Sequence, residues 1–248
     1  MSEARRLGKR PAVRLAMPTL DAYILGKPPQ PPASFTVPLA KGGWGMLGNN
    51  ACGDCTIAGA GHAIMASESH LPFVDQVTFT TDEAVRQYSA ITGYDPATGQ
   101  NDTGCVEAEV LQLWRTSGLF GGQKIEAFAP VEPHSVLAVH RAIAFYGAAY
   151  IGVQLPQSAE EQFQAGRPWT VVPDSPIVGG HCIVPVGYDA SGIYCVTWGQ
   201  VVEVSWPWWE TYVDEVWAVL FAADVEAHRG PTGLDLQALN ADLDQLAA

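Results

Sequence analysis

Residues 49–69, NNACGDCTIAGAGHAIMASES, decide the fold of this chain. A Gly-rich loop, residues 42–53, leads into Asp54, a residue type that favours the cap position before a helix. The small and apolar residues beyond it predict a helix that begins at Cys55. Its glycines would destabilise an exposed helix, so we expect a buried helix that packs closely against other backbone. Cys55 is therefore expected in the first turn of a buried helix.

A second stretch, residues 179–198, GGHCIVPVGYDASGIYCVTW, predicts two apolar strands at 180–187 and 193–198. The residues between them, Asp189-Ala190-Ser191-Gly192, are typical of a hairpin turn. His181 opens the first strand as a polar residue in an apolar run. A site residue would sit at such a position, although a lone histidine at a strand end is often structural.

The remaining pattern places helices before strands. Helices are predicted at 19–25, at 80–92 with Thr81 as cap, at 106–117 with Gly118 as C-cap, and at 134–146. Strands are predicted at 148–155 and 217–223. This order favours an α+β fold over alternating βαβ units.

Three regions are expected along the chain. A basic, Pro-rich arm spans 1–34, a main domain of two subdomains that divide near 125–130 spans 35–225, and a tail helix spans 226–248. The leucines of the tail, at 236, 239, 243 and 246, favour docking onto this chain over docking onto a partner. The tryptophans at 206–209 are expected in the core more than at a cleft mouth.

Composition limits the class of protein. The 248 residues are 48% hydrophobic and 16% charged, which indicates a globular domain with a sizeable core. The apolar runs are too short to span a bilayer, and the first thirty residues lack the apolar segment of a secretory signal. A cytoplasmic or virion-associated location and reduced thiols are therefore expected for this five-cysteine chain.

Charge is distributed unevenly. The net charge is −13, yet five of the thirteen basic residues lie in the first fourteen positions. Such an arm predicts contact with an anionic partner, whether nucleic acid, a membrane surface or an acidic protein patch, or else a solvated terminus. The acidic remainder argues against nucleic-acid binding by the main domain.

The chemistry-bearing candidates are a thiol and an imidazole. A thiol is a strong nucleophile only as thiolate, and a helix N-terminus and an imidazolium partner both favour that form. His62 lies about two helical turns beyond Cys55, too far along the helix to pair with it. The other histidines, at 70, 134, 140 and 228, fall in polar or helix-surface settings. His181 is thus the candidate partner of Cys55.

Four motifs in order resemble the papain-like (C1-type) cysteine peptidases. Residues 49–55 resemble the nucleophile loop of that family, and 180–188 resemble its histidine strand, which ends in Val-Gly-Tyr. Residues 103–105 resemble its Gly-Cys element, and Thr197-Trp198-Gly199 resemble the tripeptide that follows its catalytic asparagine. The resemblance covers roughly residues 42–222. It implies a helical half with the nucleophile helix and a half built from an antiparallel sheet or barrel.

The resemblance also implies roles. Cys55 would be the nucleophile, His181 its acid/base partner and Asn49 the side-chain donor to an oxyanion, with peptides or proteins as substrates and no metal or other cofactor. Cys52 and Cys105 could form a disulfide of about 4 kcal/mol that a reducing compartment would leave open. The arm looks too short for a typical inhibitory prosegment of the family.

The sequence also departs from the family pattern at positions near the expected site. Val196 stands where the orienting asparagine would fall, so Thr197 or Gln200 would have to hold the ring of His181. Asp54 precedes the nucleophile, and a carboxylate there would raise the pKa of the thiol. Val106-Glu107 replace a Gly-Gly pair, which predicts loss of close backbone approach by an extended peptide.

Three functions remain open from the sequence. The first is a cysteine hydrolase that works through an acyl-thioester, most simply a peptidase. The second is a weak or inactive papain-fold module in a larger assembly such as a virus or phage particle. The third is a metal or redox site at Cys52 and Cys55. Zinc binding at that site would need a second pair of ligands.

Overall fold

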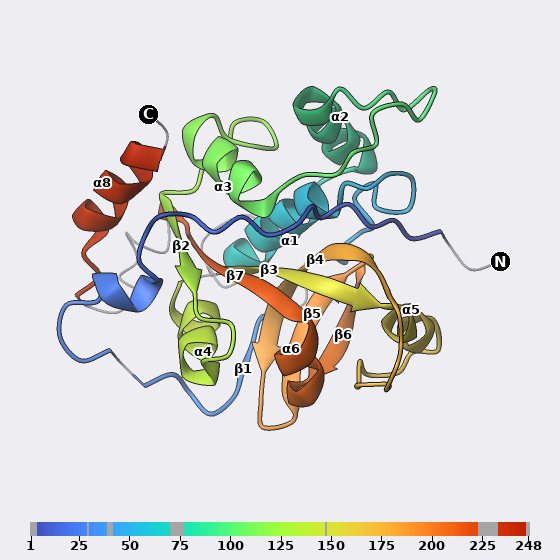
Figure 1. Cartoon of the computed structure of the whole chain (residues 1–248). Coiled ribbons are helices and arrows are strands. Elements are labelled where there is room, and N and C mark those ends of the chain that lie inside the picture. Colours follow the sequence, from blue (N-terminus) through green and yellow to red (C-terminus); the bar gives the residue numbers. More distant parts are fainter. Residues whose placement is uncertain are drawn as a thin grey trace.

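The computed structural model describes residues 4–28, 30–38, 42–69, 77–146, 148–222 and 233–246. The described chain has two halves (Figure 1). Helices α1 (Cys55–Ser69), α2 (Thr81–Thr92) and α3 (Glu107–Thr116) gather along one side of an antiparallel sheet. The α+β class predicted from the sequence is confirmed.

The sheet has the strand order β2-β7-β3-β4-β5-β6. Its strands are β2 (Ala127–Val131), β3 (Ala148–Pro156), β4 (Ile177–Tyr188), β5 (Gly192–Thr197), β6 (Gln200–Ser205) and β7 (Val213–Leu220). A short strand, β1 (Phe35–Thr36), pairs with β4. Helix α1 packs on β3 and β4, so the helix that begins at Cys55 rests directly on the strand that contains His181.

Smaller elements complete the sheet half. They are the 3₁₀ helix η1 (Leu20–Tyr23) and helices α4 (Val136–Phe145), α5 (Gln157–Gln164), α6 (Trp206–Tyr212) and α8 (Leu236–Leu246). Trp208 and Trp209 of α6 are fully buried, which confirms the core placement expected for the tryptophan cluster. The sequence did not predict β2, β6, α5 and α6, because each has eight residues or fewer and shows too little periodicity.

Three predicted boundaries need correction. Thr80, not Thr81, caps α2: its hydroxyl accepts the Glu83 amide N–H, and the Glu83 carboxylate accepts the Thr80 amide N–H in return. The helix predicted at 134–146 begins at Val136, because Ser135 is its cap. The last strand begins at Val213 rather than at 217, directly after α6.

The C-terminal helix docks on this chain, as its leucine spacing predicted. Leu239 and Leu243 are fully buried, and α8 packs on β2 and η1. The Arg115 guanidinium of α3 lies 2.7 Å from the Asp244 carboxylate. The boundary predicted at 225–226 lies outside the described residues. None of the described helices combines the length and apolarity that a membrane crossing needs.

Candidate functional site

Cys55 begins α1, as the sequence predicted, and is 1% exposed. The Asp54 carbonyl accepts the Ile57 and Ala58 amide N–H groups at 2.7 and 2.9 Å, which fixes the first turn. The Tyr150 hydroxyl donates to the Thr56 carbonyl at 2.6 Å from strand β3. The thiol is therefore carried by a helix start that is tied to the sheet.

His181 lies within β4 and is 1% exposed. Its Nε2 lies 2.7 Å from the Thr197 Oγ1, and its ring stacks on Trp198 with centroids 4.5 Å apart. Of the two residues predicted as orienters, Thr197 contacts the ring, and no hydrogen bond joins Gln200 to it among the described residues.

Strand register explains why residue 197 replaces residue 196. Val196 pairs with Val184, so its side chain lies on the face of the sheet opposite to that of His181. Thr197 is one residue further along and lies on the His181 face. A hydroxyl that accepts the Nε2 proton leaves Nδ1 as the basic nitrogen.

Cys55 and His181 come from the two halves of the chain, the thiol from the start of α1 and the ring from β4. The amide N–H of Cys182, the neighbour of His181, is directed at the Cys55 thiol. The Nδ1 of His181 is buried and has no hydrogen-bond partner among the described residues. No hydrogen bond of normal geometry joins the thiol to the ring in the described structure.

The N-terminal arm lies between the two side chains and solvent. It runs as an extended strand across the boundary between α1 and the sheet (Figure 1). Its backbone is bonded on both sides: Lys9 N donates to Gly180 O at 3.1 Å, and Arg10 N donates to Cys105 O at 2.9 Å. The arm is therefore paired on both sides at Lys9, like an added strand. The expectation that it is too short for a typical inhibitory prosegment stays a prediction.

The arm presents an amide, not a carbonyl carbon, to the thiol. The Gly8 amide N–H is directed at the Cys55 sulfur, and the Gly8 carbonyl accepts the Cys105 amide N–H at 2.9 Å. Attack on a peptide requires the carbonyl carbon to face the sulfur. In this pose the arm covers the thiol without being a substrate of it.

The backbone of the arm at Gly8 can approach the chain closely because residue 104 is a glycine. This residue has φ +67°, and a Cβ there would lie 2.0 Å from the Gly8 carbonyl oxygen. The close backbone approach of the arm is therefore made at Gly104-Cys105, and the loss of close approach expected at Val106-Glu107 stays a prediction. The Gly104 amide N–H donates to the Tyr88 hydroxyl at 2.8 Å.

Tyr88 and Asp102 were missed in the sequence. The Tyr88 hydroxyl donates to the Asp102 Oδ1 at 2.8 Å, and the same oxygen accepts the Gly53 amide N–H at 2.8 Å. Through these partly buried bonds one network holds the loop before α1 and the Gly104 edge in fixed relation. Neither residue type nor spacing could have revealed it.

Burial controls the protonation of the covered site. It raises the pKa of Cys55 to about 12, although the Cys182 and Gly8 amides act to lower it. Burial likewise lowers the pKa of His181 to about 3. The covered state therefore holds a neutral thiol beside a neutral imidazole. Asp54 acts in the expected direction and raises the pKa of Cys55 further.

Other predicted site residues have these positions. The Asn49 Nδ2 donates to the Cys52 carbonyl at 3.3 Å within the nucleophile loop. Cys52 and Cys105 are free thiols, so their pairing stays a prediction. No group of three or more His, Cys, Asp or Glu side chains among the described residues is arranged to hold a metal ion.

The remaining histidines do not approach the thiol. His62 is buried and its Nε2 contacts the Trp44 and Gly45 carbonyls. His140 stacks on Tyr188 with centroids 3.7 Å apart, and His134 pairs with Glu210 at the surface. The other two, at positions 70 and 228, lie outside the described residues.

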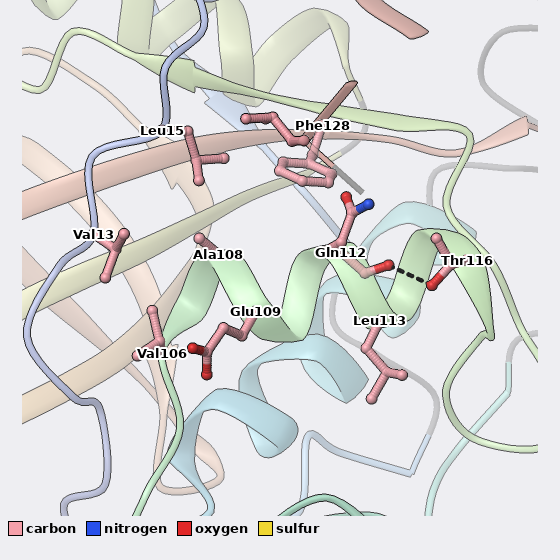
Figure 2. Close-up of a pocket in the computed structure, with 10 residues that line it drawn as sticks. Val13, Leu15, Val106, Ala108, Glu109, Gln112, Leu113, Thr116 and Phe128 are labelled. Atoms are coloured by element: carbon pink, nitrogen blue, oxygen red, sulfur yellow. Dashed lines mark hydrogen bonds between the residues drawn. The ribbon is translucent and has the colours of Figure 1, made fainter. Parts of the chain in front are cut away.

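Beyond Arg10 the arm passes over α3. Figure 2 shows Val13 and Leu15 of the arm facing Ala108 and Phe128 across a small hollow. In the same view the Thr116 hydroxyl donates to the Gln112 carbonyl at 2.8 Å. Neither Cys55 nor His181 lines this hollow. Because Val13 and Leu15 of the arm do line it, the hollow belongs to the surface on which the arm lies.

Solved structures share this architecture. Xylellain, a cysteine protease from Xylella fastidiosa, superposes with a TM-score of 0.64 at 12% identity, over 90% of this chain and 99% of that chain. This chain therefore has the papain-like fold.

Two more distant matches agree. A chain from a study of the mite allergens Blo t 1 and Der p 1 gives a TM-score of 0.52 at 14% identity, over 82% of this chain and 76% of its own. The Carica candamarcensis cysteine protease CMS1MS2, in complex with E-64, gives 0.52 at 13% identity, over 77% and 99%. No family model and no curated protein matches the sequence.

Proposed function

We propose that this papain-like chain is a cysteine hydrolase that cleaves peptides through an acyl-thioester at Cys55. One observation carries the proposal. His181 is held at one nitrogen by Thr197, its other nitrogen is unpartnered, and its neighbour Cys182 donates an amide N–H to the Cys55 thiol. A nucleophile must lie within hydrogen-bond reach of its base, and we propose that the Cys55 thiol and the free Nδ1 of His181 come within that reach when the arm leaves. The two solved cysteine proteases of similar fold, xylellain and CMS1MS2, add support.

The proposed reaction begins when the arm leaves the cleft. The Nδ1 of His181 takes the thiol proton, and the Cys55 sulfur attacks the carbonyl carbon of the peptide. The Cys55 amide N–H stabilises the oxyanion, and the Asn49 side chain, which donates to Asp54 and to the Cys52 carbonyl in the covered state, joins it once its contact with Asp54 is released. His181 then gives its proton to the leaving amine, and water hydrolyses the thioester.

Thr197 acts as a positioning residue in this scheme. Its hydroxyl accepts the Nε2 proton and so keeps Nδ1 free to serve as base. A threonine lacks the charge that would stabilise an imidazolium, which predicts a slower reaction than an asparagine- or aspartate-supported site would give.

The test uses the full chain and its Lys9→Met variant, in which the arm is held less firmly. Both are incubated with a mixture of unstructured peptides, and the products are identified by mass spectrometry. We expect cleavage that disappears in Cys55→Ala and persists in Cys195→Ala, which removes another buried cysteine. Peptides left intact by a chain whose Cys55 is open to iodoacetamide would exclude the hydrolase.

A further inference from the structure

The Lys9 side chain of the arm occupies a buried acidic pocket beside the thiol. Its Nζ lies 3.0 Å from the Asp214 Oδ2 and 2.9 Å from the Glu215 Oε1, and the side chain is 0% exposed. Because Gly8 lies at the sulfur, the pocket is one residue along an extended backbone from the reacting position. An ammonium in such a place is fully enclosed by this chain.

Gly152 of β3 lines this pocket, and its lack of a side chain leaves room for the Lys9 stem. A Cβ at this position would lie 2.0 Å from the Lys9 Cε and 2.6 Å from the Glu215 Cγ. Its φ is not in the left-handed region, so the backbone conformation does not require glycine. What requires glycine is the space taken by a long, unbranched side chain.

A third carboxyl group, that of Glu107, lies near Lys9. Glu107 is 0% exposed, and neither of its carboxyl oxygens has a hydrogen bond of normal geometry among the described residues. Burial, followed by the nearby Glu215, raises the pKa of Glu107 well above its usual value, while Lys9 acts to lower it. Burial also acts to lower the pKa of Lys9, yet the three carboxyl groups together raise it.

The two carboxylates that contact Lys9 are held in place by the sheet. The Gln154 Nε2 donates to the Asp214 Oδ2 at 2.6 Å, and the Trp217 Nε1 donates to the Glu215 Oε2 at 3.0 Å. Both acceptors are thus fixed independently of the arm. A preorganised acidic pocket favours a cationic guest, because an empty pocket would leave like charges facing one another.

We propose that this pocket receives the lysine side chain of a substrate peptide, one residue away from the residue at the Cys55 thiol, and that Lys9 fills it while the arm is in place. The inference rests on the proposed function and names its substrate class: peptides with a basic side chain next to the cleavage position. The arm is then an internal occupant of the specificity pocket.

The test measures binding in a chain that cannot cut. The full chain with Cys55→Ala and Lys9→Met is titrated into fluorescein-labelled extended peptides that differ only by Lys, Met or Glu at one position, and anisotropy is followed. We expect the Lys peptide to bind at least about 30-fold more tightly than the Met peptide, and the Glu peptide most weakly. Adding Glu215→Gln or Gly152→Val should remove most of that preference.

Binding and cutting separate the two proposals. Equal affinity for the Lys and Met peptides, or no binding by either, overturns the pocket assignment even if the wild-type chain cleaves peptides. A Lys preference without cleavage by any chain that retains Cys55 overturns the hydrolase and leaves the pocket. Should the double variant not fold, wild-type products mapped by mass spectrometry decide, since cuts must cluster within two residues of Lys.

Discussion

Replacing Lys9 by methionine in the full chain should release the arm and expose Cys55. Methionine keeps most of the aliphatic stem but removes the ammonium that contacts Asp214 and Glu215 at 3.0 and 2.9 Å. Removing one partner of a buried ion pair costs about 3–5 kcal/mol. The stranded carboxylates can take up protons, so we expect about 3 kcal/mol, the lower end.

The free energy lost on replacing Lys9 sets how often the arm leaves Cys55 exposed. Each 1.4 kcal/mol is about tenfold in an equilibrium constant, so the fraction of molecules with an open cleft should rise about 100-fold. If the arm opens and closes faster than the reagent reacts, the alkylation rate of Cys55 should rise by the same factor. The backbone bonds of the arm to Gly180 and Cys105 remain and limit the effect.

The assay is time-resolved iodoacetamide labelling at pH 8 with peptide mapping. Lys27→Met is the matched control, because Lys27 is an exposed lysine of the same arm. Cys195 is 0% exposed and reports global unfolding. The reasoning fails if Cys55 labels equally fast in wild type and Lys9→Met, or if Cys195 accelerates along with Cys55.

Three further outcomes are expected. Thr197→Val should lower kcat on peptides about 100-fold or more, because the His181 ring loses its Nε2 partner. Thr197→Ser, which keeps the hydroxyl, should retain most of the rate. Equal rates in Thr197→Val and wild type would contradict the positioning role. Tyr150→Phe should lower the free energy of unfolding in urea by about 1–3 kcal/mol, because the Thr56 carbonyl loses a buried donor at 2.6 Å, and a loss below the error of the fit would refute this. Burial lowers the pKa of His62 to about 4, so the unfolded chain binds a proton that the folded chain refuses, and stability falls as pH drops from 6.5 towards 4. His62→Gln should make that fall smaller by about 3 kcal/mol, and identical pH slopes would show that His62 is not buried in neutral form.

The sequence predicted the elements whose signal is local. The small-residue run after Asp54 gave the helix that begins at Cys55, and the turn at 189–192 gave the β4–β5 hairpin with the Asp189 N–H donating to the Gly192 carbonyl. Helix α6 had no such signal, because its seven residues follow β6 directly and are held by buried tryptophans rather than by periodicity.

The choice between Thr197 and Gln200 as partner of His181 needed the register of β4 and β5, which no single-chain pattern contains. The same holds for the arm. Its basic charge predicted an anionic partner. One of its five basic residues, Lys9, contacts carboxylates of this chain, 205 residues away at Asp214, and a separate partner for the arm stays a prediction.

From the sequence alone came the two candidate side chains Cys55 and His181, the α+β order of the elements, and the charge imbalance between arm and body. Tertiary structure alone decided that the arm lies over the thiol, that a threonine holds the imidazole, and that burial keeps both groups neutral. The physical reason is range: helix and turn preferences act over a few neighbouring residues. Desolvation and ion pairing depend instead on which distant segments the fold brings into contact.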